Sequence, residues 1–158
     1  VPGMLEKAIE NARRWGIELD VLLQDFSSLD VPANAFDVIW MSRSMYSGVP
    51  ARKRRIDMLK RIRAALKPGG CFVCQFLWWP ETREPRAVYA AKKIFAWLAG
   101  GHRGYQNGDT LTVEFLHHFL SEEEFMSEFR DAGFEVVFVG SPEQGVNKNR
   151  GAILRRPA

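Results

Sequence analysis

The side chains in this sequence that could do chemistry follow apolar runs or stand on one extended segment. Asp25 directly follows such a run, and Tyr46 lies a few residues beyond a second one. A carboxylate accepts hydrogen bonds, whereas a tyrosine can position a nucleophile or pack its ring on a cation. His102, His117 and His118 are the available general bases. Because neighbouring side chains of an extended segment point to opposite sides, at most one of His117 and His118 faces a given pocket.

The elements that must position these side chains alternate between helix and strand. Apolar residues at helical spacing predict helices, and short apolar runs predict strands. The expected helices cover residues 2–15, 50–66, 85–99 and 121–132, and the expected strands cover residues 17–24, 35–41, 71–77, 134–140 and 151–156. The alternation predicts one α/β domain over residues 1–158, with a Rossmann-like, doubly wound, mainly parallel sheet.

Three features of the pattern refine this prediction. The first three strands are nearly continuous apolar runs, as expected of strands buried on both faces. About ten loop residues join the last two strands, which predicts an antiparallel C-terminal hairpin. Ser121 with Glu124 forms a capping box at the start of the last helix.

The stretch Leu-Lys-Pro-Gly-Gly at residues 66–70 joins a helix to a strand. Pro68 cannot continue the helix, and Gly69 and Gly70 allow the positive φ that reverses the chain. The sequence therefore predicts a helix–turn–strand joint at this point.

Composition excludes several classes of protein. The chain has 158 residues, of which 46% are hydrophobic, enough for the core of one domain. No run approaches the ~18 apolar residues of a membrane span and no signal peptide opens the sequence, so we expect no membrane partner. Only two cysteines are present, which favours a cytoplasmic location. The net charge of +3 does not by itself indicate nucleic acid.

Two local patterns suggest other chemistry, and we discount both. Cys71 and Cys74 are three residues apart on an expected strand, so their sulfurs should diverge, and we expect no metal. The basic run at 52–55 occupies the polar side of an amphipathic helix and lacks interleaved aromatic residues. A solvated helix face explains it better than a nucleic-acid partner.

Four stretches occur in an order and at separations found in one family: VLLQDF (21–26), AFDVIWM (35–41), ALKPGGCFV (65–73) and LSEEEFMSEFRDAGFEVV (120–137). Together they resemble the class I S-adenosylmethionine-dependent methyltransferases over nearly the whole chain. The LKPGG turn before a strand is the most specific of the four. The resemblance implies that this joint leads into the family's fifth strand, beside the methyl-transfer site. It also implies S-adenosylmethionine as cofactor and methyl transfer to a small-molecule acceptor.

The resemblance also assigns roles to residues at strand ends. Asp25 would accept a hydrogen bond from the adenine amino group, and the backbone N–H of Phe26 would reach a ring nitrogen. Met41 and Ser42 would face the methionine part of the cofactor, and Tyr46 would line the reaction centre. The alternatives are structural: Asp25 caps a turn, Phe26 belongs to the core, Met41 and Ser42 form an ordinary strand end, and Tyr46 packs in a loop.

Residues 78–118 form the segment that least resembles the family, which often places a substrate cover here. The segment is aromatic, and such a cover suits a substrate with apolar or aromatic surface. Its aromatic residues include Trp78, Trp79, Tyr89, Phe95 and Trp97. His117, near its end, is the expected base, and the alternative is that the aromatic residues of the 85–99 helix pack in the core.

The resemblance fails at the start of the chain. The family's glycine-rich loop after its first strand and the acidic residue after its second strand have no counterpart here. Since the family orders its strands 3-2-1-4-5-7-6, the expected strands would be numbers 3 to 7, with N-terminal strands 1 and 2 missing. A hole of ~14 Å would then separate residues 17–24 from 35–41.

Three outcomes would close this hole. The missing residues precede Val1, or strand 17–24 pairs directly with 35–41, or another chain completes the sheet, as a homodimer or a partner. The alternative to an enzyme is a non-catalytic methyltransferase-like fragment or subunit that acts through partner or self association.

Overall fold

The computed structural model describes residues 2–42, 44–80, 84–98, 105–111, 115–141 and 149–158 of the chain. The four predicted helices form, and so do four of the five predicted strands. The helices are α1 (Pro2–Trp15), α2 (Arg52–Ala65), α3 (Arg86–Leu98) and α4 (Glu122–Asp131), with 3-10 turns η1 (Phe26–Ser28) and η2 (Tyr46–Gly48). None of the helices in the described ranges is long and apolar enough to cross a bilayer.

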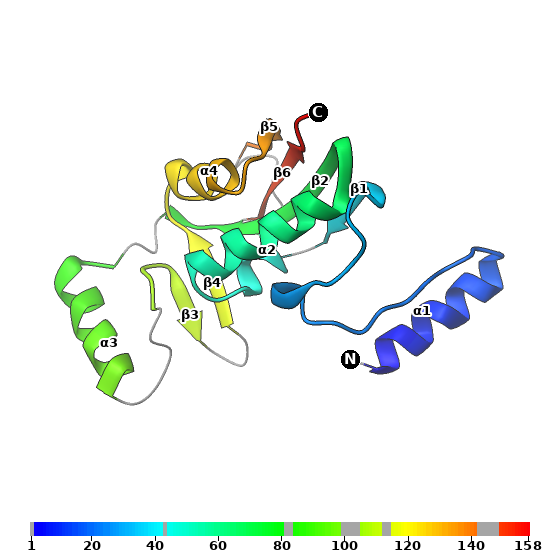
Figure 1. The fold of residues 1–158 in the computed structure, drawn as a ribbon. Helices are drawn as coiled ribbons and strands as arrows, with labels where there is room; N and C mark the ends of the chain where they lie inside the picture. Colours follow the sequence, from blue (N-terminus) through cyan, green and yellow to red (C-terminus); the bar gives the residue numbers. More distant parts are fainter. Residues whose placement is uncertain (1, 43, 81–83, 99–104, 112–114, 142–148) are drawn as a thin grey trace.

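The described strands form one curled sheet (Figure 1). They are β1 (Phe36–Met41), β2 (Leu66–Trp78), β3 (Asp109–Leu111), β4 (Phe115–Phe119), β5 (Glu135–Val139) and β6 (Asn149–Arg155). β1 runs parallel to β2, β2 runs antiparallel to β6, and β6 runs antiparallel to β5. The C-terminal hairpin therefore forms as predicted, and the order β1-β2-β6-β5 matches family strands 4-5-7-6.

The hairpin of β3 and β4 extends the sheet beyond the end of β1. β4 runs parallel to the last two residues of β2, with Leu77 opposite His118 and Trp78 opposite Phe119. β3 pairs antiparallel with β4. This hairpin and α3 both belong to the segment 78–118 that we expected to form a substrate cover.

The predicted strand at residues 17–24 is wrong, because this stretch has no regular secondary structure. It runs back from α1 toward η1, and α1 itself lies outside the body of the molecule (Figure 1). A strand needs a neighbour to satisfy its backbone N–H and C=O groups. In the described part of the chain β1 pairs with β2 alone, so direct closure of 17–24 on β1 does not occur.

One face of the sheet is covered and the other is not. On the covered face, Phe72, Cys74 and Phe76 of β2 are fully buried in one core with residues of α2 and α4. On the other face, Val38 and Trp40 of β1 are 60% and 71% exposed. The expectation that strand 35–41 is buried on both faces is therefore wrong, because no helix of the described chain packs on this side of it.

The LKPGG joint lies where α2 ends and β2 begins. α2 ends at Ala65 and β2 begins at once, so that Leu66 and Cys71 pair with Phe36 and Val38, and the intervening residues form a bulge. The N–H of Gly69 donates to the carbonyl of Arg156 at 3.0 Å, and the N–H of Arg156 donates to Gly70 at 2.9 Å. The joint thus fixes the start of β2 against the chain that follows β6.

Candidate functional site

Asp25 stands directly before η1, on the linker that leads to β1. Its Oδ1 accepts hydrogen bonds from the backbone N–H and the hydroxyl of Ser27, at 2.7 and 2.8 Å. These bonds, with a smaller contribution from the charge of Arg54, hold the pKa of Asp25 below its ordinary value. Asp25 therefore caps a turn, as the structural alternative proposed, while its side chain remains exposed and ionised.

The other three predicted cofactor residues lie on two elements. Phe26 begins η1, and its side chain lies outside what the structure describes. Met41, the last residue of β1, is only 4% exposed and packs in the core. Ser42 follows it and is exposed at the carboxyl end of β1. Of these residues, Asp25 and Ser42 offer accessible polar side chains.

Tyr46 is buried in η2, the turn that follows β1. Its ring stacks on Phe119 at a centroid distance of 5.7 Å, and its hydroxyl donates to Glu128. Burial and then the charge of Glu128 raise the pKa of Tyr46 well above its ordinary value. The phenol is therefore a neutral hydrogen-bond donor that ties the loop after β1 to α4.

A buried ion pair between Arg55 of α2 and Glu128 of α4 holds the centre of this region. Both side chains are 0% exposed, and an Arg55 Nη2–Glu128 Oε1 distance of 2.7 Å joins them. Arg55 also donates to the side chain of Gln106 and to the carbonyl of Val49. The pair therefore connects two helices, the loop after β1 and the segment that leads into β3.

His117 of β4 lies in a second part of the same buried network. Its Nδ1 is 2.7 Å from Asp109 Oδ1 of β3, and its Nε2 is 3.0 Å from Glu124 Oε1 of α4. Burial alone would lower the pKa of His117, but hydrogen bonds to the two carboxylates raise it above its ordinary value. An imidazolium donates to both carboxylates at once, so His117 clamps the β3–β4 hairpin to α4.

The two other histidines differ from His117. His118 points to the opposite side of β4, as strand alternation predicted, with its ring 5.6 Å from that of Trp79. His102 lies outside the described residues.

Sequence reasoning missed Arg55 and Glu128, although the sequence carries a signal for both. Arg55 shares a helical stripe with Leu59 and Ile62, all buried. Glu128 similarly falls between the buried Phe125 and Phe129. A cation in one apolar stripe and an anion in another predict a buried pair, since an isolated buried charge is costly. The expectation that the whole run 52–55 is solvated is therefore wrong at Arg55.

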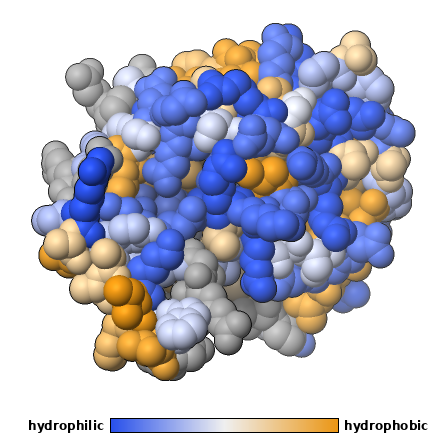
Figure 2. Space-filling view, turned by 60° about the vertical axis from the view of Figure 1, so that its left-hand side comes forward, coloured by the Kyte–Doolittle hydropathy of each residue, from blue (hydrophilic) through white to orange (hydrophobic). Residues whose placement is uncertain are grey.

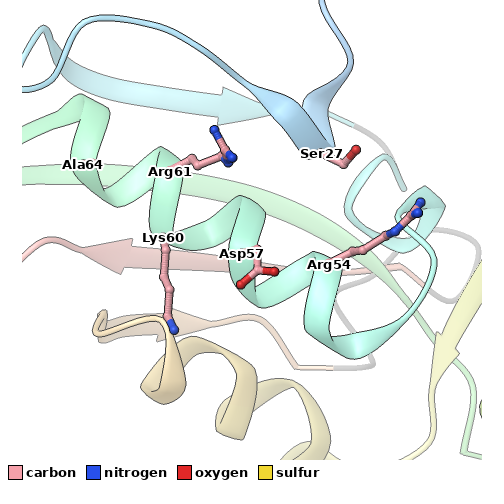
Figure 3. A pocket seen from close by; sticks show the side chains of 6 residues that line it. All are labelled: Ser27, Arg54, Asp57, Lys60, Arg61 and Ala64. Carbon is pink, nitrogen blue, oxygen red and sulfur yellow. The ribbon is translucent and has the colours of Figure 1, made fainter. Parts of the chain in front are cut away.

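A basic recess of about 470 Å³ lies between η1 and the outer side of α2. Figure 3 shows Arg54 and Arg61 extending toward the side of α2 on which Ser27 lies, whereas Lys60 points away from Ser27. Asp57, which also lines the recess, accepts a hydrogen bond from Lys53 at 2.8 Å. Ser27, which lines the recess, is two residues from Asp25 in the sequence. The recess itself lies on the surface of α2 rather than at the carboxyl ends of the strands.

A second, apolar groove of about 260 Å³ follows the free side of β1. Leu29 and Val31 of the linker and Ile62 of α2 line it together with β1 residues that include Met41.

The two cysteines have different surroundings. Cys71 is half-buried, whereas Cys74 is fully buried, and this burial raises the pKa of its thiol to about 12. Within the described ranges, no group of three His, Cys, Asp or Glu side chains could hold a metal ion.

The first part of the chain matches a known protein family in sequence. Residues 1–70 match a family model described as a methyltransferase domain. No curated protein is similar enough in sequence to count as a match.

Solved structures match over most of the chain. An S-adenosylmethionine-dependent methyltransferase from Methanosarcina mazei is 20% identical with a TM-score of 0.60, and the match covers 85% of this chain and 65% of that one. One from Clostridium acetobutylicum ATCC 824 is 11% identical with a TM-score of 0.72, over 100% and 73%. The [4+2]-cyclase SpnF is 21% identical with a TM-score of 0.57, over 95% and 61%.

The chain thus spans 61–73% of the length of these three structures. Identities this low show the fold and leave the reaction open, as the cyclase illustrates. The family match, the solved structures and the β1-β2-β6-β5 order together show that the chain has the fold of the class I S-adenosylmethionine-dependent methyltransferases.

Proposed function

We propose that this chain is part of an enzyme that transfers a methyl group from S-adenosylmethionine to a small-molecule acceptor. The observation that carries the proposal is the β1-β2-β6-β5 order of the sheet, in which the LKPGG joint leads into β2 and Ser42 is exposed at the carboxyl end of β1. In open α/β sheets, ligands bind outside the carboxyl ends of the strands.

The residues present suit one end of the cofactor. Asp25 is exposed and ionised, and Oδ1 is the oxygen that caps η1, so the carboxylate can still accept from an adenine amino group. In the proposal, Phe26 contributes its backbone N–H, and Met41 and Ser42 contact the methionine part. The bound cofactor supplies an electrophilic methyl group on a sulfonium. The work of the protein is then to hold and orient the acceptor beside it.

Tyr46 and His117 stay the proposed catalytic side chains, and their surroundings define what each could do. Tyr46 is a neutral phenol whose proton is held by Glu128, so it would position the loop that carries Ser42. His117 would accept a proton from the acceptor only after releasing Asp109 or Glu124. In the conformation described, both side chains are fully buried, so catalysis by either requires movement of the β3–β4 hairpin or of η2.

The proposed location and partners follow from the same residues. Arg52 pairs with Asp131 and Lys53 with Asp57, which favours a structural role for the basic run over contact with nucleic acid. The unpaired thiols of Cys71 and Cys74 suit a cytoplasmic location.

The open side of β1 favours a second candidate, a non-catalytic methyltransferase-like subunit. In the described chain, β1 has one strand neighbour, and Val38 and Trp40 are exposed beside its free edge. Such an edge is a template for a further strand from a second copy or a partner chain. The two candidates differ in whether the residues encoded before Val1 supply a strand and a glycine-rich loop.

The test is calorimetric titration of S-adenosylhomocysteine into the protein expressed with whatever its reading frame encodes before Val1. The enzyme proposal expects saturable binding at one site, and transfer of labelled methyl from S-adenosylmethionine to a small-molecule acceptor. No binding, together with a strand-mediated dimer or hetero-complex, would favour the non-catalytic subunit.

A further inference from the structure

The helix α3 carries a face of large apolar side chains that nothing in the described chain covers. The exposed fractions are 60% for Ile94, 73% for Phe95, 64% for Trp97 and 69% for Leu98. Figure 2 shows hydrophobic side chains gathered at the lower left of the molecule, over α3. Soluble proteins rarely expose a contiguous patch of this kind without a binding role.

The apolar side chains of α3 share one side of the helix. With 100° per residue, the apolar positions fill roughly half of the circumference. They begin at Trp97 and continue through Ile94, Leu98 and Phe95 to Val88. The helix is therefore amphipathic, with its apolar side turned to solvent.

The opposite side of α3 explains this orientation. Tyr89 is half-buried, its ring stacks on Tyr105 at 5.8 Å, and its hydroxyl donates to the carbonyl of Tyr105. Lys92 pairs with Glu84, and Lys93 lies 5.8 Å above the Tyr89 ring. The helix thus packs on Glu84 and Tyr105 through its polar side, and within the described residues its apolar side is not part of the core.

The charges on α3 indicate what would cover its apolar face. Arg86, Lys92 and Lys93 flank the apolar side, and Glu84, which precedes the helix, pairs with Lys92, so the segment 84–98 keeps a net positive charge. Cations at the borders of an apolar face, with Trp and Phe within it, characterise helices that lie in the interface of an anionic bilayer. We infer that α3 docks this protein on the surface of a membrane that contains anionic lipids.

A surface attachment agrees with the dimensions of the helix. Its 13 residues extend about 20 Å, too short to cross a bilayer but sufficient to lie along one. The expectation of no membrane partner rested on the lack of a spanning segment, and an interfacial helix does not require one. This attachment goes beyond the proposed methyl transfer and would hold with or without it.

Flotation with vesicles tests the inference on the whole chain. We expect binding to vesicles of mixed phosphatidylcholine and phosphatidylglycerol, weakened by salt, and much less binding to phosphatidylcholine alone. Phe95→Glu should weaken partition by about tenfold or more, since it places a charge in the buried face. Lys92→Gln with Lys93→Gln should weaken it by about fivefold or more on the anionic vesicles.

Met4→Glu is the matched control, because Met4 is 71% exposed on another helix and the change in charge is the same. This variant should bind like the wild type, and all variants should keep the wild-type melting temperature. The inference is overturned if the wild type does not float with anionic vesicles, or if Phe95→Glu floats equally well. It is also overturned if the wild type forms an oligomer without lipid that Phe95→Glu dissolves, because α3 would then be an interface between copies.

Discussion

At the scale of single residues, the ion pair of Arg55 and Glu128 decides whether α2 and α4 stay together around the loop after β1. Arg55→Met leaves Glu128 charged and buried, and should lower the free energy of unfolding by about 3–5 kcal/mol. Replacing both partners, Arg55→Met with Glu128→Leu, should cost less than either single change. Urea unfolding of the four proteins measures this cycle, and additive losses would show that the two side chains are not coupled.

His117 should make the stability of the fold depend on pH. Its pKa in the folded protein lies above the ordinary value of 6.5. The stabilisation is therefore complete below pH 6.5 and is lost as the pH rises through the folded pKa. Urea unfolding between about pH 6 and pH 9 should show this loss, and His117→Gln should flatten it. His118→Gln is the control, and an equal flattening there would refute the assignment.

Asp25 tests the adenine end of the proposed site. In the complete protein, Asp25→Ala should weaken binding of S-adenosylhomocysteine by about 0.5–1.5 kcal/mol, up to roughly tenfold, with the fold intact. Ser27→Ala separates the cap from the ligand contact, because it removes a donor to Asp25 but keeps the carboxylate. Unchanged affinity in Asp25→Ala, at an unchanged melting temperature, would remove Asp25 from the site.

At the scale of elements, the LKPGG joint requires glycine at position 70 because of a close backbone approach. A Cβ at Gly70 would lie 2.9 Å from the carbonyl oxygen of Lys67 and 3.0 Å from that of Asp37. Gly70→Ala should therefore destabilise the protein by about 1–3 kcal/mol, as overpacking does. Gly3→Ala, with nothing within 4 Å of the added Cβ, is the control and should not destabilise. Equal thermal melting of the two variants would contradict this account of the joint.

The predicted helices and strands differ in how far apart in the sequence the residues that stabilise them lie. Helices were predicted well because their signals are local, as in the capping box where Ser121 accepts from the N–H of Glu124. The strand at 17–24 was predicted wrongly. An apolar run forms a strand only beside a partner strand, and the run itself does not show whether it has one. For the same reason the exposed face of β1 could not be foreseen.

The residues of the candidate site also differ in whether the sequence nearby or a distant contact determines their position. Ser42 follows the end of a strand that an apolar run marks, whereas the apolar run before Asp25 does not form a strand. The contacts of Tyr46 and His117 could not be predicted, because Glu128 and Glu124 reach them from α4, far along the sequence. Pairing of this kind depends on how helices pack over the sheet.

At the scale of the whole molecule, the 158 residues carry the proposed adenine end of a cofactor site, and β1 has one strand neighbour in the described chain. No sequence position here corresponds to the family's glycine-rich loop or ribose-binding acid. The resemblance therefore predicts that this chain lacks most polar partners of the ribose and methionine parts, and that its binding energy falls short of the cost of immobilising the ligand. We expect the chain alone to bind cofactor weakly and to methylate nothing.

The most direct test of the proposed site is titration of the ¹⁵N-labelled 158-residue chain with S-adenosylhomocysteine, followed by amide chemical shifts. The account predicts shifts that saturate only well above micromolar ligand and that concentrate at residues 25–27 and 41–42. Asp25→Ala should abolish the shifts at residues 25–27. If the amide signals of residues 25–27 and 41–42 do not move, the proposed site is contradicted. Micromolar binding by a monomer would contradict the view that the sheet edge beside β1 is incomplete.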